Sequence, residues 1–170
     1  LFLGLLTKLF GFKLLLFKLF NVVFNFFAVY FFYKTFYKRI PIIVLIPVML
    51  FVSCNHLIQY YASMTFTEAF YLFLQSLFFF WFFKLYDALQ TEPNANKHYK
   101  LWLMLGLFTF LIATCKSVAI VAVPVLIIYF LLEKQWKNAG FAFGAYLVFK
   151  VPYELLVKLI WGSQNQFSGQ

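Results

Sequence analysis

Charged residues are scarce in this chain of 170 residues, of which only 11% are Asp, Glu, Lys or Arg. A soluble domain has about 25% charged and roughly 45–50% apolar residues, whereas 65% of this chain is hydrophobic, with 27 Phe and a mean hydropathy of +0.88. So little polar surface cannot cover a water-soluble globule of this size. The composition argues against a soluble enzyme and a disordered chain, and it indicates lipid as the solvent.

Acidic residues are the rarest charged group, with five Asp and Glu against 14 Lys and Arg, which gives a net charge of +9. A nucleic-acid partner would require these basic residues to cluster on one face or strip. Here they lie between apolar runs, which is how membrane proteins orient themselves and contact anionic lipid headgroups. We therefore expect membrane lipid as a partner and no nucleic acid.

Cysteine is also rare, because the chain has only Cys54 and Cys115, each alone in an apolar stretch and without a CxxC pattern. A disulfide framework or a zinc site has little support, and both residues are expected to pack in the interior. The sequence further lacks a Gly-rich phosphate loop, an HExxH motif, a nucleophile elbow and a clustered acid pair. It predicts no metal site and no soluble-type nucleotide site.

Long apolar runs are what the chain has instead. A membrane-crossing helix needs about 20 mostly apolar residues, and the candidates are residues 12–32, 40–60, 67–86, 101–132 and 139–161, with residues 1–10 as the end of an earlier helix or a short interfacial one. We predict an all-α fold: one polytopic integral membrane helix bundle over residues 1–170, with about six membrane-crossing helices, some of them short.

The run at residues 101–132 is interrupted at residues 114–117, and we expect it to cross the membrane twice. Two crossings keep Lys134 and Lys137 on the same side as the other basic loops, as the positive-inside rule requires. Residues 33–39, 87–100 and 133–138 are then cytoplasmic, and residues 60–66, 114–117 and 162–170 lie outside. Each helix would have about 14–15 residues, or about 21 Å, against a hydrocarbon core of about 30 Å. The turn at Lys116 would then lie below the outer surface, where protein or a water-filled cavity must surround it.

Ionisable residues within such spans often line pathways or binding sites. Glu68 lies in the sequence Thr65-Phe66-Thr67-Glu68, which fits a helix capping box. It is therefore either a structural cap or a carboxylate at the outer mouth that binds a substrate hydroxyl, an amine or a metal, and one residue can do both.

Lys116 and His56 are the other candidate binding residues. The Lys116 ammonium is suited to bind a phosphate, and the alternatives are snorkelling to the headgroups or pairing with Glu68. His56 forms a polar face with Asn55 and Gln59; it is either a hydrogen-bonded packing residue or a catalyst or ligand. Lys150, Glu154 and Lys158 are spaced to share one helix face, where they pair and line the protein interior or, alternatively, a substrate groove.

Four segments resemble the GT-C glycosyltransferases, in particular the protein O-mannosyltransferase and aminoarabinose transferase group. These segments are Leu-Phe-Gly at residues 9–11 with the basic residue and Leu of residues 16–21, the basic turn at residues 33–39, the loop and acidic residue at residues 63–70, and the Gly-Leu to Thr-Cys-Lys stretch at residues 105–116. Lys18 stands where the family usually has Arg.

The resemblance implies a membrane glycosyltransferase of the cell envelope that moves a sugar from a polyprenyl-phosphate donor to a glycan, lipid or protein acceptor on the outer side of the membrane. It implies that Glu68 and Lys116 lie near the cavity where donor and acceptor meet. The family's catalytic base lies in an outer loop upstream of the matched region. No catalytic residue is therefore predicted here, and the cofactor stays open, with a divalent metal ion as one way to stabilise the leaving phosphate.

Two other functions stay open on the residues alone. A transporter or flippase subunit would use the charged residues to line a translocation path, and a membrane scaffold would have no site.

The chain starts at Leu1 within an apolar stretch, so we expect a fragment of a larger protein. Because 13 of the 14 basic residues are Lys, the composition points to AT-rich coding and to a bacterial inner membrane.

Overall fold

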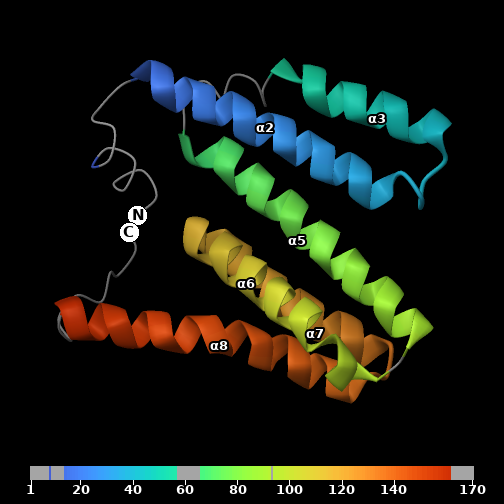
Figure 1. Ribbon diagram of the computed structural model, residues 1–170, viewed down its shortest axis with the longest axis vertical. Helices are drawn as coiled ribbons and strands as arrows, with labels where there is room; N and C mark the ends of the chain where they lie inside the picture. Colours follow the sequence, from blue (N-terminus) through green and yellow to red (C-terminus); the bar gives the residue numbers. More distant parts are fainter. Residues whose placement is uncertain (1–7, 9–13, 57–65, 93, 162–170) are drawn as a thin grey trace. The chain divides into compact units, whose positions relative to one another are not determined.

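The computed structural model describes residues 8, 14–56, 66–92 and 94–161. In these residues the chain forms α-helices and two 3₁₀ helices and has no strand, which confirms the all-α class (Figure 1). Contacts divide the chain into two compact units, Leu1–Lys84 and Leu85–Gln170, and each is described by itself. The first unit contains α2 (Leu14–Phe36), α3 (Ile42–Cys54) and most of α5 (Phe66–Thr91). The second contains the end of α5, η1 (Ala95–His98), α6 (Tyr99–Cys115), η2 (Ser117–Val121), α7 (Ala122–Leu132) and α8 (Trp136–Trp161).

In the first unit, phenylalanine rings join α2 to α5. The ring centroids of Phe24 and Phe73 are 5.5 Å apart, and those of Phe36 and Phe83 are 5.4 Å apart. Because the partners advance in the same order along both helices, α2 and α5 run parallel. Aromatic pairs at these distances stabilise packing beyond the burial of their area.

Helix α3 follows a short turn at Pro41 and runs antiparallel to α2. Only Leu45 of its residues is buried, at 1% exposed, while most of the helix surface is apolar and exposed. The exposed apolar side chains are Ile42, Ile43, Val44, Ile46, Val48, Leu50 and Phe51. Such a continuous apolar surface is unusual on a soluble monomer and is typical of a lipid-facing segment.

In the second unit, the ring contacts of Trp102 show in which directions three helices run. The centroid of its indole ring lies 5.5 Å from the ring of Phe130, near the end of α7, and 5.9 Å from the ring of Phe141, near the start of α8. The start of α6, the end of α7 and the start of α8 therefore share one end of the unit. Helices α6 and α8 run parallel, and α7 runs back between these ends.

Three helical stretches are long and apolar enough to cross a membrane: Leu15–Phe36, Glu68–Thr91 and Ala95–Cys115. The apolar stretches Ile42–Cys54 and Ser117–Leu132 are shorter. Helix α8 is long, but its four charged residues lower its mean hydropathy. The sequence predicted about six crossings, of which the described residues supply three by length and composition.

Several helix boundaries differ from the predicted spans. The second span was expected over residues 40–60, but α3 ends at Cys54 because Asn55 adopts an extended backbone; residues 57–60 lie outside the described residues. The third span was expected over residues 67–86, but α5 continues five residues further, to Thr91. Its last residues are mostly polar, so a hydrophobic pattern does not show where the helix ends.

The break in the run at residues 101–132 is confirmed at Lys116, whose backbone is extended between α6 and η2. The first helix was predicted to have about 14–15 residues, and this prediction is wrong. The 3₁₀ helix η1 extends it towards the N-terminus through polar residues, which gives a stretch of 21 residues, Ala95–Cys115. That length corresponds to about 31 Å. Length alone therefore does not force Lys116 below the outer surface.

Candidate functional site

The first unit contains a cavity of about 700 Å³ between α2, α3 and α5. Its walls are mostly apolar, and four polar side chains open into it: Asn25, Ser53, Gln75 and Ser76. The apolar walls are Val22, Phe26, Ala28, Val29 and Phe32 of α2, Met49 and Val52 of α3, and Leu72 and Phe79 of α5. An apolar cavity of this size with a few convergent polar groups is the usual form of a small-molecule or lipid site.

The four polar groups differ in how they are satisfied. The Ser76 hydroxyl is buried and donates to the carbonyl of Phe73 at 2.7 Å, as hydroxyls in apolar helices commonly do. The amides of Asn25 and Gln75 are half-buried, and no hydrogen bond joins either of them to a residue that the structure describes. Each amide offers two donors and one acceptor to a ligand in the cavity.

Glu68 lies on the cavity side of α5. It is the third residue of the helix and precedes Leu72 by one turn, so it shares the face on which Leu72 and Ser76 line the cavity. Its position relative to the helix start is the one that a capping box requires, while Thr65 lies outside the described residues. Glu68 is half-buried and is the single acidic residue of the first 84.

His56 lies near the same end of the first unit as Glu68. It follows the cavity residue Ser53 by three positions, just after α3, and its side chain is exposed. Because α3 is antiparallel to α2 and α5, the end of α3 and the start of α5 lie towards the same end of the unit. The structure therefore brings two of the three predicted binding residues to one end of the cavity; Gln59, the third member of the predicted polar face, lies outside the described residues.

Lys116 belongs to the second unit. Its backbone N–H donates to the carbonyl of Ile112 at 3.0 Å, and its carbonyl accepts from the N–H of Ala119 at 3.0 Å. These two bonds hold the turn between α6 and η2, and the side chain is half-buried. Within this unit the turn lies at the end opposite to Trp102. Lys134, just before α8, and Lys137, in the first turn of α8, lie at the Trp102 end.

The charged stripe on α8 pairs as predicted, with Lys150 Nζ 3.6 Å from Glu154 Oε1. Its location differs from the expected interior position, because Glu154 and Lys158 are exposed. Cys54, expected to pack in the interior, is exposed at the end of α3, and Cys115 is half-buried.

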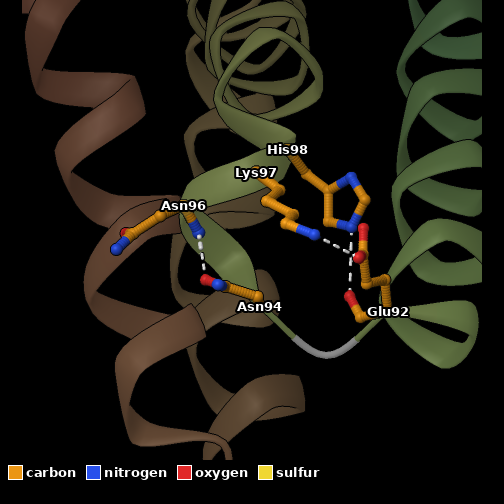
Figure 2. Close-up of polar contacts among 5 residues, drawn as sticks. All are labelled: Glu92, Asn94, Asn96, Lys97 and His98. Atoms are coloured by element: carbon orange, nitrogen blue, oxygen red, sulfur yellow. Dashed lines mark hydrogen bonds and ion pairs between the residues drawn. The ribbon is translucent and has the colours of Figure 1, made fainter.

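A polar turn connects α5 to α6 in the second unit (Figure 2). The Lys97 ammonium pairs with the Glu92 carboxylate, and the His98 ring Nε2 lies 3.0 Å from the Glu92 carbonyl oxygen. The Asn94 side chain accepts from the Asn96 N–H at 3.2 Å. The Lys97 ammonium beside Glu92 lowers the pKa of that carboxyl below its ordinary value of 4.5.

Sequence reasoning missed the cavity's polar residues because, within the spans, it weighed the ionisable groups and the polar face around His56 and no other uncharged polar residue. A usable signal was present: Asn25 lies in a Phe-rich span, and Gln75 and Ser76 lie within an otherwise apolar one. Uncharged polar residues in a span are also costly to bury in lipid without partners. Their spacing on α5 relative to Glu68 would have placed them on one face.

Metal binding finds no support in the described part of the chain, where no three His, Cys, Asp or Glu side chains come together as ligands. Comparison with known proteins gives no family assignment, because the chain matches no protein-family model, no curated protein and no solved structure.

Proposed function

We propose that this chain is part of an integral membrane glycosyltransferase of the GT-C type, and that its first unit receives the lipid chain of a polyprenyl-phosphate sugar. The supporting observation is the cavity of about 700 Å³ between α2, α3 and α5, which has apolar walls, four uncharged polar groups and no charged lining residue. An isoprenoid chain needs such apolar walls, because each buried methylene contributes about 0.8 kcal/mol to binding.

The location of Glu68 fits a site for the polar end of the donor or for the acceptor. Glu68 lies one turn beyond the cavity lining on α5, and the exposed His56 lies at the same end. A lipid chain in the cavity would direct its sugar phosphate towards one end of the unit. In this proposal Glu68 binds a hydroxyl of the sugar or acceptor, while the base that deprotonates the acceptor lies outside the matched segments.

Lys116 is proposed to stabilise the leaving phosphate on the outer side. The support is the resemblance of residues 105–116 and the position of Lys116 in a turn at one end of the second unit. The bacterial inner membrane as location, and a glycan, lipid or protein as acceptor, belong to the same proposal.

The test measures release of radiolabelled sugar from a polyprenyl-phosphate carrier by the full protein in membranes. Ala28→Leu narrows the cavity, so we expect the KM for the donor to rise about fivefold, equivalent to about 1 kcal/mol of lost apolar contact. Val23→Leu is the control, because Val23 lies on the same helix and is 38% exposed, outside the cavity lining. Lys116→Ala should lower kcat, and Lys158→Ala should not.

Two results would contradict the proposal: no sugar release with any carrier, or equal KM values for Ala28→Leu and Val23→Leu.

A transporter is the second candidate, favoured by the charged Lys150–Glu154 pair on α8. It predicts flux of an unmodified substrate across liposomes and loss of that flux in Glu154→Gln.

A further inference from the structure

A second apolar groove lies in the other unit, between α6 and α8, with a volume of about 550 Å³. Its floor includes Gly140 and Gly144, and a Cβ added at either glycine would meet no atom within 4 Å. The groove extends from Lys137 to Val148, a length of about 16 Å along the helix. That length corresponds to about one leaflet, half of a hydrocarbon core of about 30 Å.

A cavity of about 430 Å³, whose lining includes several polar side chains, adjoins this groove at the start of α8. Lys137 lines both spaces, and Lys134, Gln135 and Asn138 line the smaller one. Both lysines are exposed, and among the described residues neither forms an ion pair. Trp136, which lines the adjoining cavity together with both lysines, is 71% exposed, as is common for tryptophan at a membrane interface.

The apolar groove and the adjoining cavity with its two lysines meet at Lys137. This arrangement matches a ligand that has one apolar chain and one anionic headgroup. A phosphate beside Lys134 and Lys137 would neutralise two lysines that the described chain leaves without a carboxylate. A second copy of the chain fits this groove less well. Parallel packing through Gly140 and Gly144 would bring the Lys137 side chains of both copies together, and like charges repel.

We propose that the second unit binds an anionic phospholipid at the start of α8, with one acyl chain in the α6–α8 groove over Gly140 and Gly144 and the headgroup phosphate between Lys134 and Lys137. This site is separate from the cavity of the first unit, and it does not depend on the proposed glycosyltransferase activity.

The test uses the full protein in nanodiscs of equimolar phosphatidylglycerol and phosphatidylcholine, and mass spectrometry counts the lipids that stay bound after a mild detergent wash. Phosphatidylglycerol should be retained preferentially. Each of Lys134→Gln and Lys137→Gln should reduce that preference about fivefold, and the double variant about 25-fold. Lys158→Gln is the control, because it removes the same charge from the exposed end of the same helix.

The groove is tested separately with Gly144→Leu, whose side chain would occupy the acyl position. It should abolish retention of phosphatidylglycerol, whereas Phe143→Leu, at a residue that is 46% exposed and outside the groove, should not. Inorganic phosphate should not displace the lipid, because it lacks the apolar chain.

The proposal is overturned by equal retention of both lipids, by an equal effect of Lys158→Gln and the paired lysine variants, or by displacement with inorganic phosphate. A dimer that dissociates in Gly144→Leu while lipid retention persists would assign the groove to a second copy instead. If Gly144→Leu fails to fold, the lipid retention of the double lysine variant tests the proposal. Both of its substituted positions are exposed, so this variant is expected to fold.

Discussion

Gly106 lies where α6 and α8 approach closely. A Cβ added at this position would lie 2.4 Å from the carbonyl oxygen of Ala145 and 2.8 Å from its Cβ. Small residues allow such close backbone contacts between helices, and in lipid these contacts supply much of the packing energy. The Gly-Leu step that carries part of the family resemblance therefore also has a structural role here.

Gly106→Ala should destabilise the second unit by about 1–3 kcal/mol, because the clash is with backbone atoms that cannot rotate away. Gly140→Ala is the matched control in the partner helix, since its added Cβ meets open space. It should stabilise α8 by about 0.5–1 kcal/mol through helix propensity. Thermal unfolding of both variants in the same detergent compares them, and similar shifts in Tm would contradict this packing.

The Glu92–Lys97 pair makes the α5–α6 turn sensitive to acid. The folded pKa of Glu92 lies below 4.5. The stability that the pair gives to the folded turn is therefore fully present above that pH, and it is lost as the pH falls through the folded pKa. An NMR titration of the Glu92 carboxyl should therefore have a midpoint below 4.5. Lys97→Gln should return the midpoint towards that value, and Lys100→Gln should leave it lowered. An unchanged midpoint in Lys97→Gln would show that the pair does not form.

At the scale of the elements, Arg39 holds the α2–α3 turn against α5. Its guanidinium carbon lies 4.5 Å from the centroid of the Phe83 ring, and its Nη2 donates to the Phe83 carbonyl at 3.3 Å. A stacked, hydrogen-bonded arginine of this kind joins segments that are 44 positions apart in the sequence. The neighbouring Lys38 contacts the ring of Tyr37 instead, within its own segment.

Arg39→Met should therefore loosen the start of α3, whereas Lys38→Met should not. Loss of an exposed cation–π contact costs about 0.5–1 kcal/mol, which corresponds to amide exchange about two- to fivefold faster. Hydrogen exchange of the Val44 and Leu45 amides, which bond to the Pro41 carbonyl, reports on this region. Equal protection in the two variants would mean that Arg39 does not join the turn to α5.

Helix content and the break at Lys116 could be predicted from the sequence, because apolar runs and an isolated polar interruption are local signals. The helix ends were less predictable: η1 and the last turn of α5 contain polar residues, and backbone hydrogen bonding rather than hydrophobicity extends these helices. The cavity could not be predicted, since its walls come from three helices whose parallel and antiparallel order depends on ring packing between distant residues such as Phe24 and Phe73.

At the scale of the whole molecule, the described residues of each unit include more basic side chains at one end than at the other. In the first unit Lys38 and Arg39 lie at the end opposite to Glu68, and in the second Lys134 lies at the end opposite to Lys116. The positive-inside rule then assigns the basic ends to the cytoplasm. This assignment extends the proposal that the chain crosses a membrane.

Single cysteines introduced into a Cys54→Ser, Cys115→Ser background test that orientation. A cysteine in place of Lys38, Lys97 or Lys134 should react with an impermeant maleimide after the membrane is permeabilised and not before. A cysteine in place of Lys116 or His56 should react in intact cells. Labelling of Lys97→Cys in intact cells would contradict the proposed orientation.

The central claim, that the first unit's cavity receives the lipid chain of the donor, is tested most directly by photolabelling. A polyprenyl phosphate with a diazirine in its isoprenoid chain is added to the full protein in membranes, and the labelled residues are mapped by mass spectrometry. We predict labels on cavity-lining residues of all three helices, such as Val29, Val52 and Leu72, and their loss with excess unlabelled carrier. Labels confined to lipid-facing side chains such as Ile43 and Phe51, which are 82% and 72% exposed, would contradict the claim.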